Sequence, residues 1–137
     1  MSRATDLADC SALTLLALYR SGDASPVEAT RAVLDRIERF NPILNAFCHL
    51  APDDALAAAR ASESRWQRGA PCGELDGVPV SVKDLILAAG WPTLRGSRTV
   101  DPAGPWDVDA PATARLREAG AVIVGKTATP EFGCKGE

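Results

Sequence analysis

Apolar residues recur at helical spacing through much of the first half of the chain. Residues 7–19 carry a leucine-rich face, and Gly22 follows at the kind of position where a helix stops. The motif Ser25-Pro26-Val27-Glu28 combines a capping serine, a proline in the first helical position and a glutamate that can reach back to the cap. The pattern predicts two consecutive helices, and Asn41-Pro42 is expected to end the second.

A short strand and a third helix complete this half. Residues 45–50 alternate loosely between apolar and polar side chains, which predicts a strand. Pro52 is expected to open a helix that stops near Gly69. Its residues at helical spacing are Ala55, Leu56, Ala59, Ser62 and Trp66. We interpret Trp66 as a packing residue.

The second half contains two short apolar runs, residues 78–82 and 121–124. Their continuous apolarity predicts buried strands with both faces covered. A helix is expected over residues 111–119, with Asp109 as its cap and Gly120 as its stop. A strand, a helix and a strand in this order predict a parallel pair in an α/β sheet.

Composition and charge narrow the class of protein. The 137 residues are 46% hydrophobic and 24% charged, with 15 Lys+Arg against 18 Asp+Glu, which is typical of one ordinary globular domain. The slight acidic excess argues against nucleic-acid binding. The longest largely apolar run, residues 13–19, is far shorter than the roughly 20 residues of a membrane span. Acidic residues precede it where a signal peptide needs positive charge, so we expect a cytoplasmic protein without a membrane partner.

The cysteines and the histidine do not suggest a metal site. Cys10, Cys48, Cys72 and Cys134 lie far apart in the sequence, and the single histidine, His49, adjoins only one of them. We expect reduced, mostly buried thiols, and a strand or loop role for His49. Cys134 has no histidine near it in sequence and is not expected to act as a nucleophile. No metal or organic cofactor is predicted.

Two lysines stand at or near the ends of the predicted buried strands. Lys83 follows Val82, and Lys126 follows Val124-Gly125. Ligands collect at the carboxyl ends of strands in open α/β sheets, and a lysine in a dry site can lose its proton and act as a base. The alternative is an ion pair or a solvated strand end, and position alone favours that alternative.

Residues 73–84, GELDGVPVSVKD, resemble the lysine motif of the amidase signature family. Other blocks resemble that family in the same order: residues 21–26, residues 41–47, Gly96-Ser97-Arg98, residues 119–127 and residues 129–133. The resemblance therefore covers nearly the whole chain. It implies an α/β fold in which N-terminal helices, residues 1–69, precede the first strands of a mixed sheet flanked by helices, residues 70–137. Both parts would belong to one domain, an incomplete amidase signature fold.

The family resemblance implies hydrolysis of a carboxamide by a nucleophilic serine, a second serine in a cis peptide, and a lysine. Lys83 matches the lysine. Its uncharged amine would take a proton from the bridging serine, which takes one from the nucleophile, so burial or neighbouring donors should disfavour charge on Lys83. In the family both serines follow a segment like Thr129-Pro130-Glu131-Phe132-Gly133, which is expected to begin another helix. Because this chain ends at Glu137, we expect it to be inactive by itself.

Other polar residues near these motifs receive structural interpretations. Ser81 shares a strand face with Lys83 but lies inside the strand, where substrate cannot easily reach. Ser97 is expected to serve a turn. Lys126 does not match the family's catalytic lysine, and Asp84 is expected to be a structural partner. Within the long irregular stretch, residues 85–106, three residues are candidates for the rim of the substrate site: Trp91, Arg95 and Arg98.

Two alternatives stay open. The A-type subunit of the transfer-RNA-dependent Glu/Asp amidotransferase shares the signature, although residues 129–136 resemble the general amidases more closely. A protein of another class, a non-catalytic helical interaction module, would yield a protease-resistant fragment ending near Gly69. The partners expected for an amidase are a small-molecule amide, whose identity the sequence does not specify, and a second copy of the chain.

Overall fold

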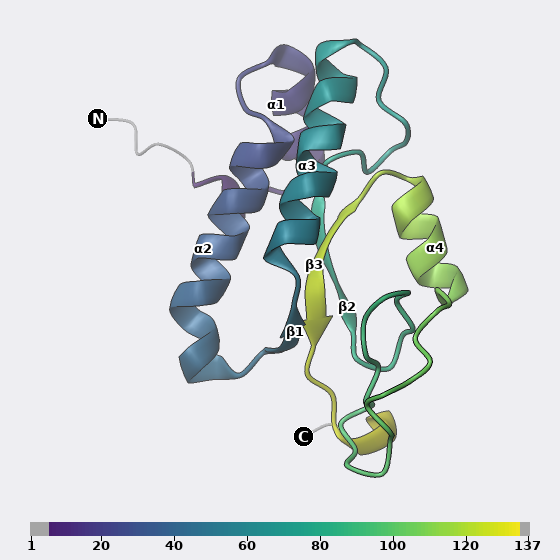
Figure 1. Ribbon diagram of the computed structural model, residues 1–137. Coiled ribbons are helices and arrows are strands. Elements are labelled where there is room, and N and C mark those ends of the chain that lie inside the picture. Colours follow the sequence, from purple (N-terminus) through teal and green to yellow (C-terminus); the bar gives the residue numbers. More distant parts are fainter. Residues whose placement is uncertain (1–5, 135–137) are drawn as a thin grey trace.

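The computed structural model describes residues 6–134, which form four α-helices, two short 3-10 turns and a three-stranded sheet (Figure 1). The chain follows an α/β plan in which helices alternate with strands after the first two helices. In order the elements are η1 (Leu7–Asp9), α1 (Ala12–Ser21), α2 (Pro26–Leu44), β1 (Phe47–Leu50), α3 (Pro52–Gln67), β2 (Pro79–Lys83), α4 (Pro111–Glu118), β3 (Val122–Thr127) and η2 (Glu131–Gly133).

The helix signals that depend on local chemistry are confirmed. The Ser25 hydroxyl accepts a hydrogen bond from the backbone N–H of Glu28 at 3.2 Å, and the Glu28 carboxylate accepts one from the backbone N–H of Ser25 at 2.8 Å. Gly22 ends α1 with a φ of 80°, a conformation that favours glycine. The third helix begins at Pro52 as predicted and ends two residues before Gly69.

Two predicted helix boundaries are wrong. Residues 7–19 do not form one helix, because the chain is extended at Cys10 and Ser11 between η1 and α1, and Ser11 caps α1 by accepting from Thr14 N at 3.1 Å. Asn41-Pro42 does not end α2, which continues to Leu44. Proline removes only one backbone donor there, so the last turn persists until Asn45 adopts a left-handed conformation.

The start of α4 also differs from expectation. Ala110, not Asp109, is the N-cap residue, and no side chain caps this helix. The Asp109 carboxylate instead accepts from the backbone N–H of Ala89 at 2.6 Å and pairs with Arg117 at 3.0 Å. Asp109 thus contacts Ala89, in the loop after β2, instead of capping α4. Gly120 follows the end of the helix with a φ of 83°, as predicted for a stop.

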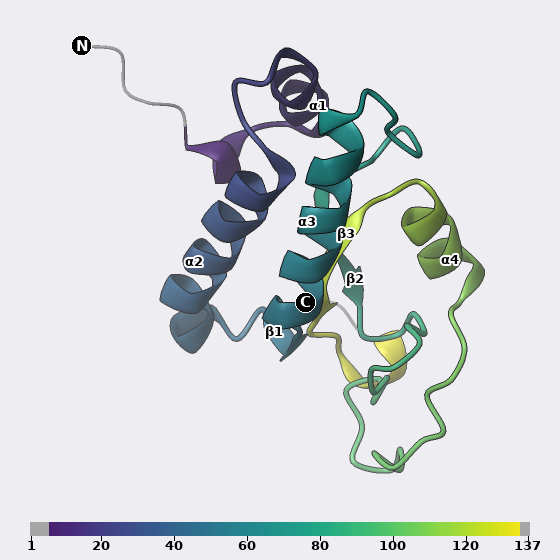
Figure 2. The ribbon, with the colours of Figure 1, turned by 45° about the horizontal axis from the view of Figure 1, so that its top comes forward.

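The sheet is mixed, with strand order β1-β3-β2. Strands β2 and β3 are parallel, as predicted, and β1 pairs with β3 in antiparallel orientation. Val122 and Val124 of β3 pack against α2 and α3, whereas Ile123 and Val82 pack with the loop residues Ala88 and Trp91. Figure 2 shows α2 and α4 on opposite sides of β2 and β3.

Burial differs between the two parallel strands, β2 and β3. Every residue of β3 except Thr127 is buried, as its apolar run predicts. In β2 the side chains of Ser81 and Lys83 are exposed, so the prediction that both of its faces are covered is wrong within residues 6–134. Strand β2 lies at the edge of this sheet, and both of these side chains are exposed there.

A bulge in β3 changes the direction of its later side chains. Val80 pairs with Ile123, but Ser81 pairs with Gly125 and Val82 with Lys126, so β3 has one extra residue. Such an insertion moves the following side chains to the other face of the sheet. Lys126 therefore shares a face with Val82 instead of with Val122 and Val124.

The helical half and the sheet form a common core. Strand β1 and helix α3 of the first half both pack against β3. The Tyr19 hydroxyl donates to the backbone oxygen of Gly77 at 3.1 Å, and the Trp66 indole N–H donates to that of Asp76 at 3.0 Å. Trp66 also packs against Tyr19, with ring centroids 5.9 Å apart, which confirms its packing role. No helix within residues 6–134 is long and apolar enough to span a membrane.

Candidate active site

Lys83 is the last residue of β2, and its side chain is exposed. Alternation along the strand places it on the face opposite the buried Val82. No hydrogen bond or ion pair from any residue in the described range holds its ammonium group. We expected burial or neighbouring hydrogen-bond donors around the Lys83 amine. Within residues 6–134 the amine is exposed and has no such neighbours. Ser81, on the same face, is also exposed, so the expectation that it is hard to reach is wrong here.

The backbone around Lys83 is held firmly even though its side chain is not. Lys83 pairs with Thr127 of β3, and its carbonyl oxygen accepts from Ile86 N at 2.9 Å. The backbone N–H of Asp84 donates to the oxygen of Thr127, also at 2.9 Å. Both sides of Lys83 in sequence are therefore tied to the sheet or to the following turn.

Lys126 is fully buried and ion-paired, as the structural interpretation of this lysine predicts. Its Nζ lies 2.8 Å from Oδ1 of Asp84 and 3.1 Å from the carbonyl oxygen of Pro92, and it also donates to the Thr93 hydroxyl. Asp84 is itself buried. The expected structural role of Asp84 is thus visible as a pairing with Lys126.

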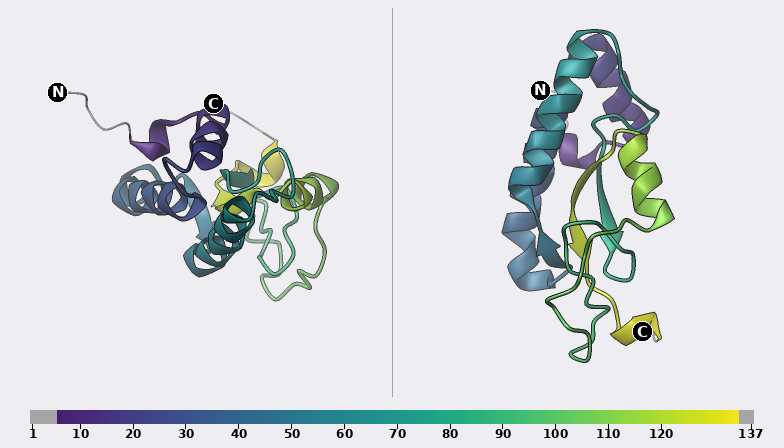
Figure 3. Two further views of the ribbon diagram at one scale, coloured as in Figure 1. Left: turned by 90° about the horizontal axis from the view of Figure 1, so that it is seen from above. Right: turned by 45° about the vertical axis from the view of Figure 1, so that its right-hand side comes forward.

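Residues 95–99 contact the segment that follows β3. The Ser97 hydroxyl donates to Oε1 of Glu131 at 2.7 Å and accepts from the backbone N–H of Thr99 at 3.2 Å, which is the turn role expected for it. A Cβ on Gly96 would lie 2.6 Å from the carbonyl oxygen of Thr129, so only glycine permits this close approach. Two of the motif blocks are thereby brought together (Figure 3).

Within the described residues, the segment after Thr129 forms a 3-10 turn, Glu131–Gly133, which ends at Cys134. Phe132 there has a φ of 50°, and its backbone N–H donates to the oxygen of Arg95 at 2.8 Å. Lys135 to Glu137, where the expected helix would continue, lie outside the described residues.

The three residues proposed for the rim of the substrate site differ in exposure. Trp91 is buried rather than on a rim, because its ring packs on His49 at a centroid distance of 5.3 Å and its indole N–H donates to Asp54 at 3.3 Å. Arg95 is half-buried and Arg98 is exposed, so these two remain accessible. Tertiary packing against β1 removes Trp91 from the set.

Cys48 and His49 lie close to the buried ion pair. Although the Cys48 residue is exposed as a whole, partial burial of its thiol raises the pKa, and the charge of Asp84 adds to this effect. Burial lowers the pKa of His49, and the charge of Lys126 lowers it further. His49 lies in β1, as expected, and residues 6–134 contain no cluster of potential metal ligands.

The expectation that most thiols are buried is wrong. Cys48, Cys72 and Cys134 are exposed and Cys10 is half-buried; all four are free. Three of them occupy a strand edge or a loop, where a small apolar side chain can remain in contact with solvent at little cost.

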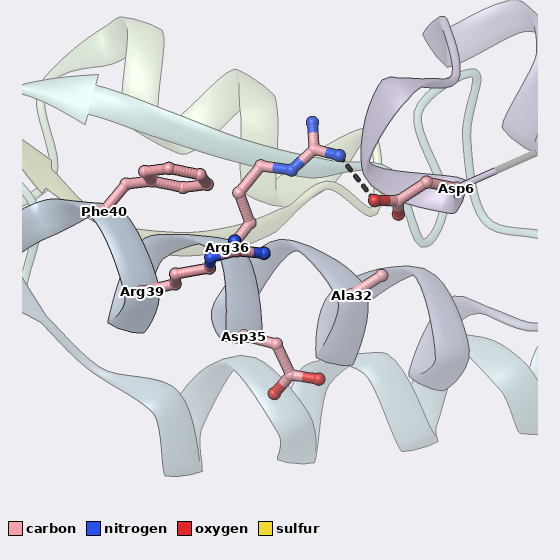
Figure 4. A pocket seen from close by; sticks show the side chains of 6 residues that line it. All are labelled: Asp6, Ala32, Asp35, Arg36, Arg39 and Phe40. Atoms are coloured by element: carbon pink, nitrogen blue, oxygen red, sulfur yellow. Dashed lines mark hydrogen bonds and ion pairs between the residues drawn. The ribbon is translucent and has the colours of Figure 1, made fainter.

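A surface hollow lies beside helix α2, away from Lys83 and the other residues of the family motifs. It is lined by Asp6, Ala32, Asp35, Arg36, Arg39 and Phe40 (Figure 4). Arg36 crosses it to pair with Asp6 and Asp9, each at 2.5 Å. None of these residues belongs to β2, β3 or the loop after Lys83, so we assign the candidate site to the motif residues instead.

Comparison with known proteins identifies relatives of this chain. The family model described as Amidase matches residues 28–137. The chain is 44% identical over 128 residues to the A-type subunit of glutamyl-tRNA(Gln) amidotransferase from Chloroflexus aurantiacus, covering 93% of this chain and 26% of that protein. It is 44% identical over 126 residues to the protein of the same name from Myxococcus xanthus, covering 92% of this chain and 26% of that protein.

Solved structures agree with the sequence relatives. The native peptide amidase from Stenotrophomonas maltophilia superimposes with a TM-score of 0.83 at 35% identity, covering 91% of this chain and 26% of that one. A bacterial aryl acylamidase superimposes with a TM-score of 0.78 at 31% identity, covering 90% and 26%. The chain thus spans about a quarter of the length of the relatives that it matches.

Proposed function

This chain belongs to the amidase family, and on that premise we propose that the whole protein hydrolyses the C–N bond of a small carboxamide. The products are a carboxylate and ammonia or an amine. The observation that carries the proposal is the placement of Lys83, which stands at the carboxyl end of β2 with an exposed side chain on a firmly held backbone. In open α/β sheets this edge is where ligands bind.

In the proposed reaction Lys83 acts as the base of a Ser–cis-Ser–Lys relay. Its uncharged amine accepts a proton from the bridging serine, which accepts one from the nucleophilic serine as that serine attacks the amide carbon. The relay then returns the proton to the leaving nitrogen, and water releases the acyl group as a carboxylate. The two serines are family residues outside the motif blocks of this chain. No metal or organic cofactor is needed for these steps.

A second candidate, the A-type subunit of an amidotransferase, is favoured by the names of the 44%-identical relatives. Two structural neighbours instead carry amidase names, which favour the first candidate. Both candidates use the same lysine chemistry. They differ in whether the protein works alone or needs partner proteins and a transfer RNA.

The shared core weakens the case for a separate helical interaction module. Strand β1, within residues 1–69, pairs with β3, so the first half buries part of its surface against the second. We propose a cytoplasmic location and a small-molecule amide as the partner, with a second copy of the chain as a further candidate partner.

The test compares Lys83→Ala with the unmodified whole protein. Ammonia release is measured from primary carboxamides, from acetamide to benzamide and including glutamine. We expect Lys83→Ala to lower kcat by about a thousandfold or more. Arg20→Ala, at an exposed position in α1, is the matched control and should retain full activity.

The outcomes separate the candidates. Retention of activity by Lys83→Ala would overturn the assignment of the base. Release of ammonia from simple carboxamides without partners supports an amidase. Release only from glutamine, and only with added partner proteins, supports the amidotransferase reading.

A further inference from the structure

The two lysines near the sheet edge differ in their surroundings. The Lys126 ammonium has three N–H donors, and three acceptors meet it: the Asp84 carboxylate, the Pro92 carbonyl oxygen and the Thr93 hydroxyl. Lys126 is therefore suited to hold these three groups together.

The groups that Lys126 holds are those that follow Lys83 in the chain. Asp84 is the next residue, and its side chain is buried against Lys126, which shares the face of Val82, whereas the Lys83 side chain is exposed. The Asp84 carbonyl oxygen accepts from Arg95 N at 3.1 Å, so Asp84 also closes the loop that contains Pro92 and Thr93. The buried ammonium of Lys126, in β3, thus contacts both Asp84 at the end of β2 and the loop residues Pro92 and Thr93.

Lys83 has no side-chain partner among the residues that the structure describes. The position of its amine accordingly depends on the backbone on which it stands. That backbone is fixed by the ladder to β3 and by Asp84, whose buried carboxylate has Lys126 as its cation. Loss of the cation would leave a buried charge without a partner and favour displacement of Asp84.

We propose that Lys126 is a positioning residue for Lys83 and acts through Asp84. This inference rests on the proposed function, because it takes Lys83 as the base. The ion pair restrains the carboxyl end of β2 from the face opposite the reacting amine. A shift of about 1 Å in a reacting group can cost about a hundredfold in rate, so restraint at this point affects catalysis directly.

The test uses two variants of the whole protein, Lys126→Met and Asp84→Asn. Methionine fills most of the volume of the lysine stem, and asparagine preserves the shape of the aspartate. We expect either change to lower kcat by about ten- to a hundredfold while KM changes less than about threefold, because positioning acts on the reaction more than on substrate binding. The substrate is the carboxamide that the unmodified protein turns over fastest.

Asp76→Asn is the matched control. It breaks another ion pair of a buried carboxylate, that of Asp76 with the partly exposed Arg65, which joins α3 to the segment before β2. All rates are measured per folded molecule, at a temperature well below the Tm of every variant. A kcat loss in Asp76→Asn as large as in the two test variants would show a general effect of destabilisation and overturn the inference.

Further outcomes keep the test decisive. If Lys126→Met does not fold, Asp84→Asn gives the result, and Thr93→Val, which removes one acceptor of Lys126 and keeps the ion pair, should give a smaller loss of kcat. Unchanged kcat in the folded variants would overturn the inference. If Lys83→Ala retains activity, the proposed base is wrong; if it is inactive while the other variants match Asp76→Asn, only the positioning role is wrong.

Discussion

Arg65 holds the buried carboxylate of Asp76 with two hydrogen bonds, 2.6 Å from Nη2 to Oδ1 and 2.9 Å from Nε to Oδ2. The same carboxylate accepts from the Ser62 hydroxyl at 2.6 Å and from the backbone N–H of Cys72 at 2.9 Å. Arg65 and Ser62 belong to α3, and Asp76 lies shortly before β2. This network therefore joins the helical half of the chain to the sheet.

Replacement of Asp76 by asparagine should destabilise the protein strongly. The amide cannot pair with the Arg65 guanidinium, which is left partly buried without its partner. Breaking such a pair typically costs about 3–5 kcal/mol, and we expect about 3 kcal/mol because Arg65 is partly exposed. Urea denaturation measures the change. Asp35→Asn, at an exposed position in α2, should change stability by less than about 0.5 kcal/mol. A loss below about 1 kcal/mol for Asp76→Asn would contradict the assigned role.

The same network predicts acid sensitivity. Burial pushes the pKa of Asp76 upwards, but the hydrogen bonds from Arg65, Ser62 and the backbone of Cys72 outweigh it and lower the pKa below its usual value. The unfolded chain then binds the proton first as pH falls, with a pKa of about 3.9. The ionised Asp76 carboxylate therefore adds to the free energy of unfolding above about pH 4. This added stability is lost as pH falls through the folded-state pKa of Asp76. The stability difference between the unmodified protein and Asp76→Asn should shrink in that window.

His49 should make stability depend on pH nearer neutrality. Its pKa is lowered by burial and by the charge of Lys126, whereas the unfolded chain protonates at about pH 6.5. The unfolded state thus binds more protons below that pH, and stability is full above about pH 6.5 and falls as pH drops towards the folded-state pKa. Phenylalanine preserves the packing on Trp91 without titrating. The measured test is the stability of His49→Phe relative to the unmodified protein at pH 7.5 and at pH 5.5, and a constant difference between them would refute this assignment.

Gly125 marks the point where β1 approaches the bulge in β3. A Cβ there would lie 2.3 Å from the carbonyl oxygen of His49, which is backbone and cannot rotate away. Gly125→Ala should therefore cost about 2–3 kcal/mol through displacement of β1. Ser81→Ala is the control, because Ser81 pairs with Gly125 from β2 and is exposed. Thermal denaturation should show a lower Tm for Gly125→Ala only, and equal Tm values for both variants would rule out the close contact as the cause.

Much of the fold could be predicted because its signals are local. The Ser25–Glu28 capping box, the left-handed Gly22 and the proline at the start of α3 act on residues within one helical turn, so sequence spacing alone reveals them. The parallel pairing of β2 and β3 followed from their apolar runs and the helix between them. The candidate base, Lys83, was also reached from sequence, through its motif and its place at a strand end, and its catalytic role stays a prediction.

Tertiary structure decided the features that depend on distant partners. Asp109 was predicted to cap α4. It instead accepts a hydrogen bond from Ala89 and pairs with Arg117, because the folded chain brings both groups to its carboxylate. Trp91 was assigned to a rim and instead packs on His49. Lys126 would face the helices if β3 alternated strictly, and the bulge turns it to Asp84. Sequence alone therefore determined most of the elements and the place of Lys83 at a strand end. The burial and pairing of charged groups such as Lys126 and Asp84 depended on which strands and loops meet, since a buried ion pair forms only where packing brings both charges together.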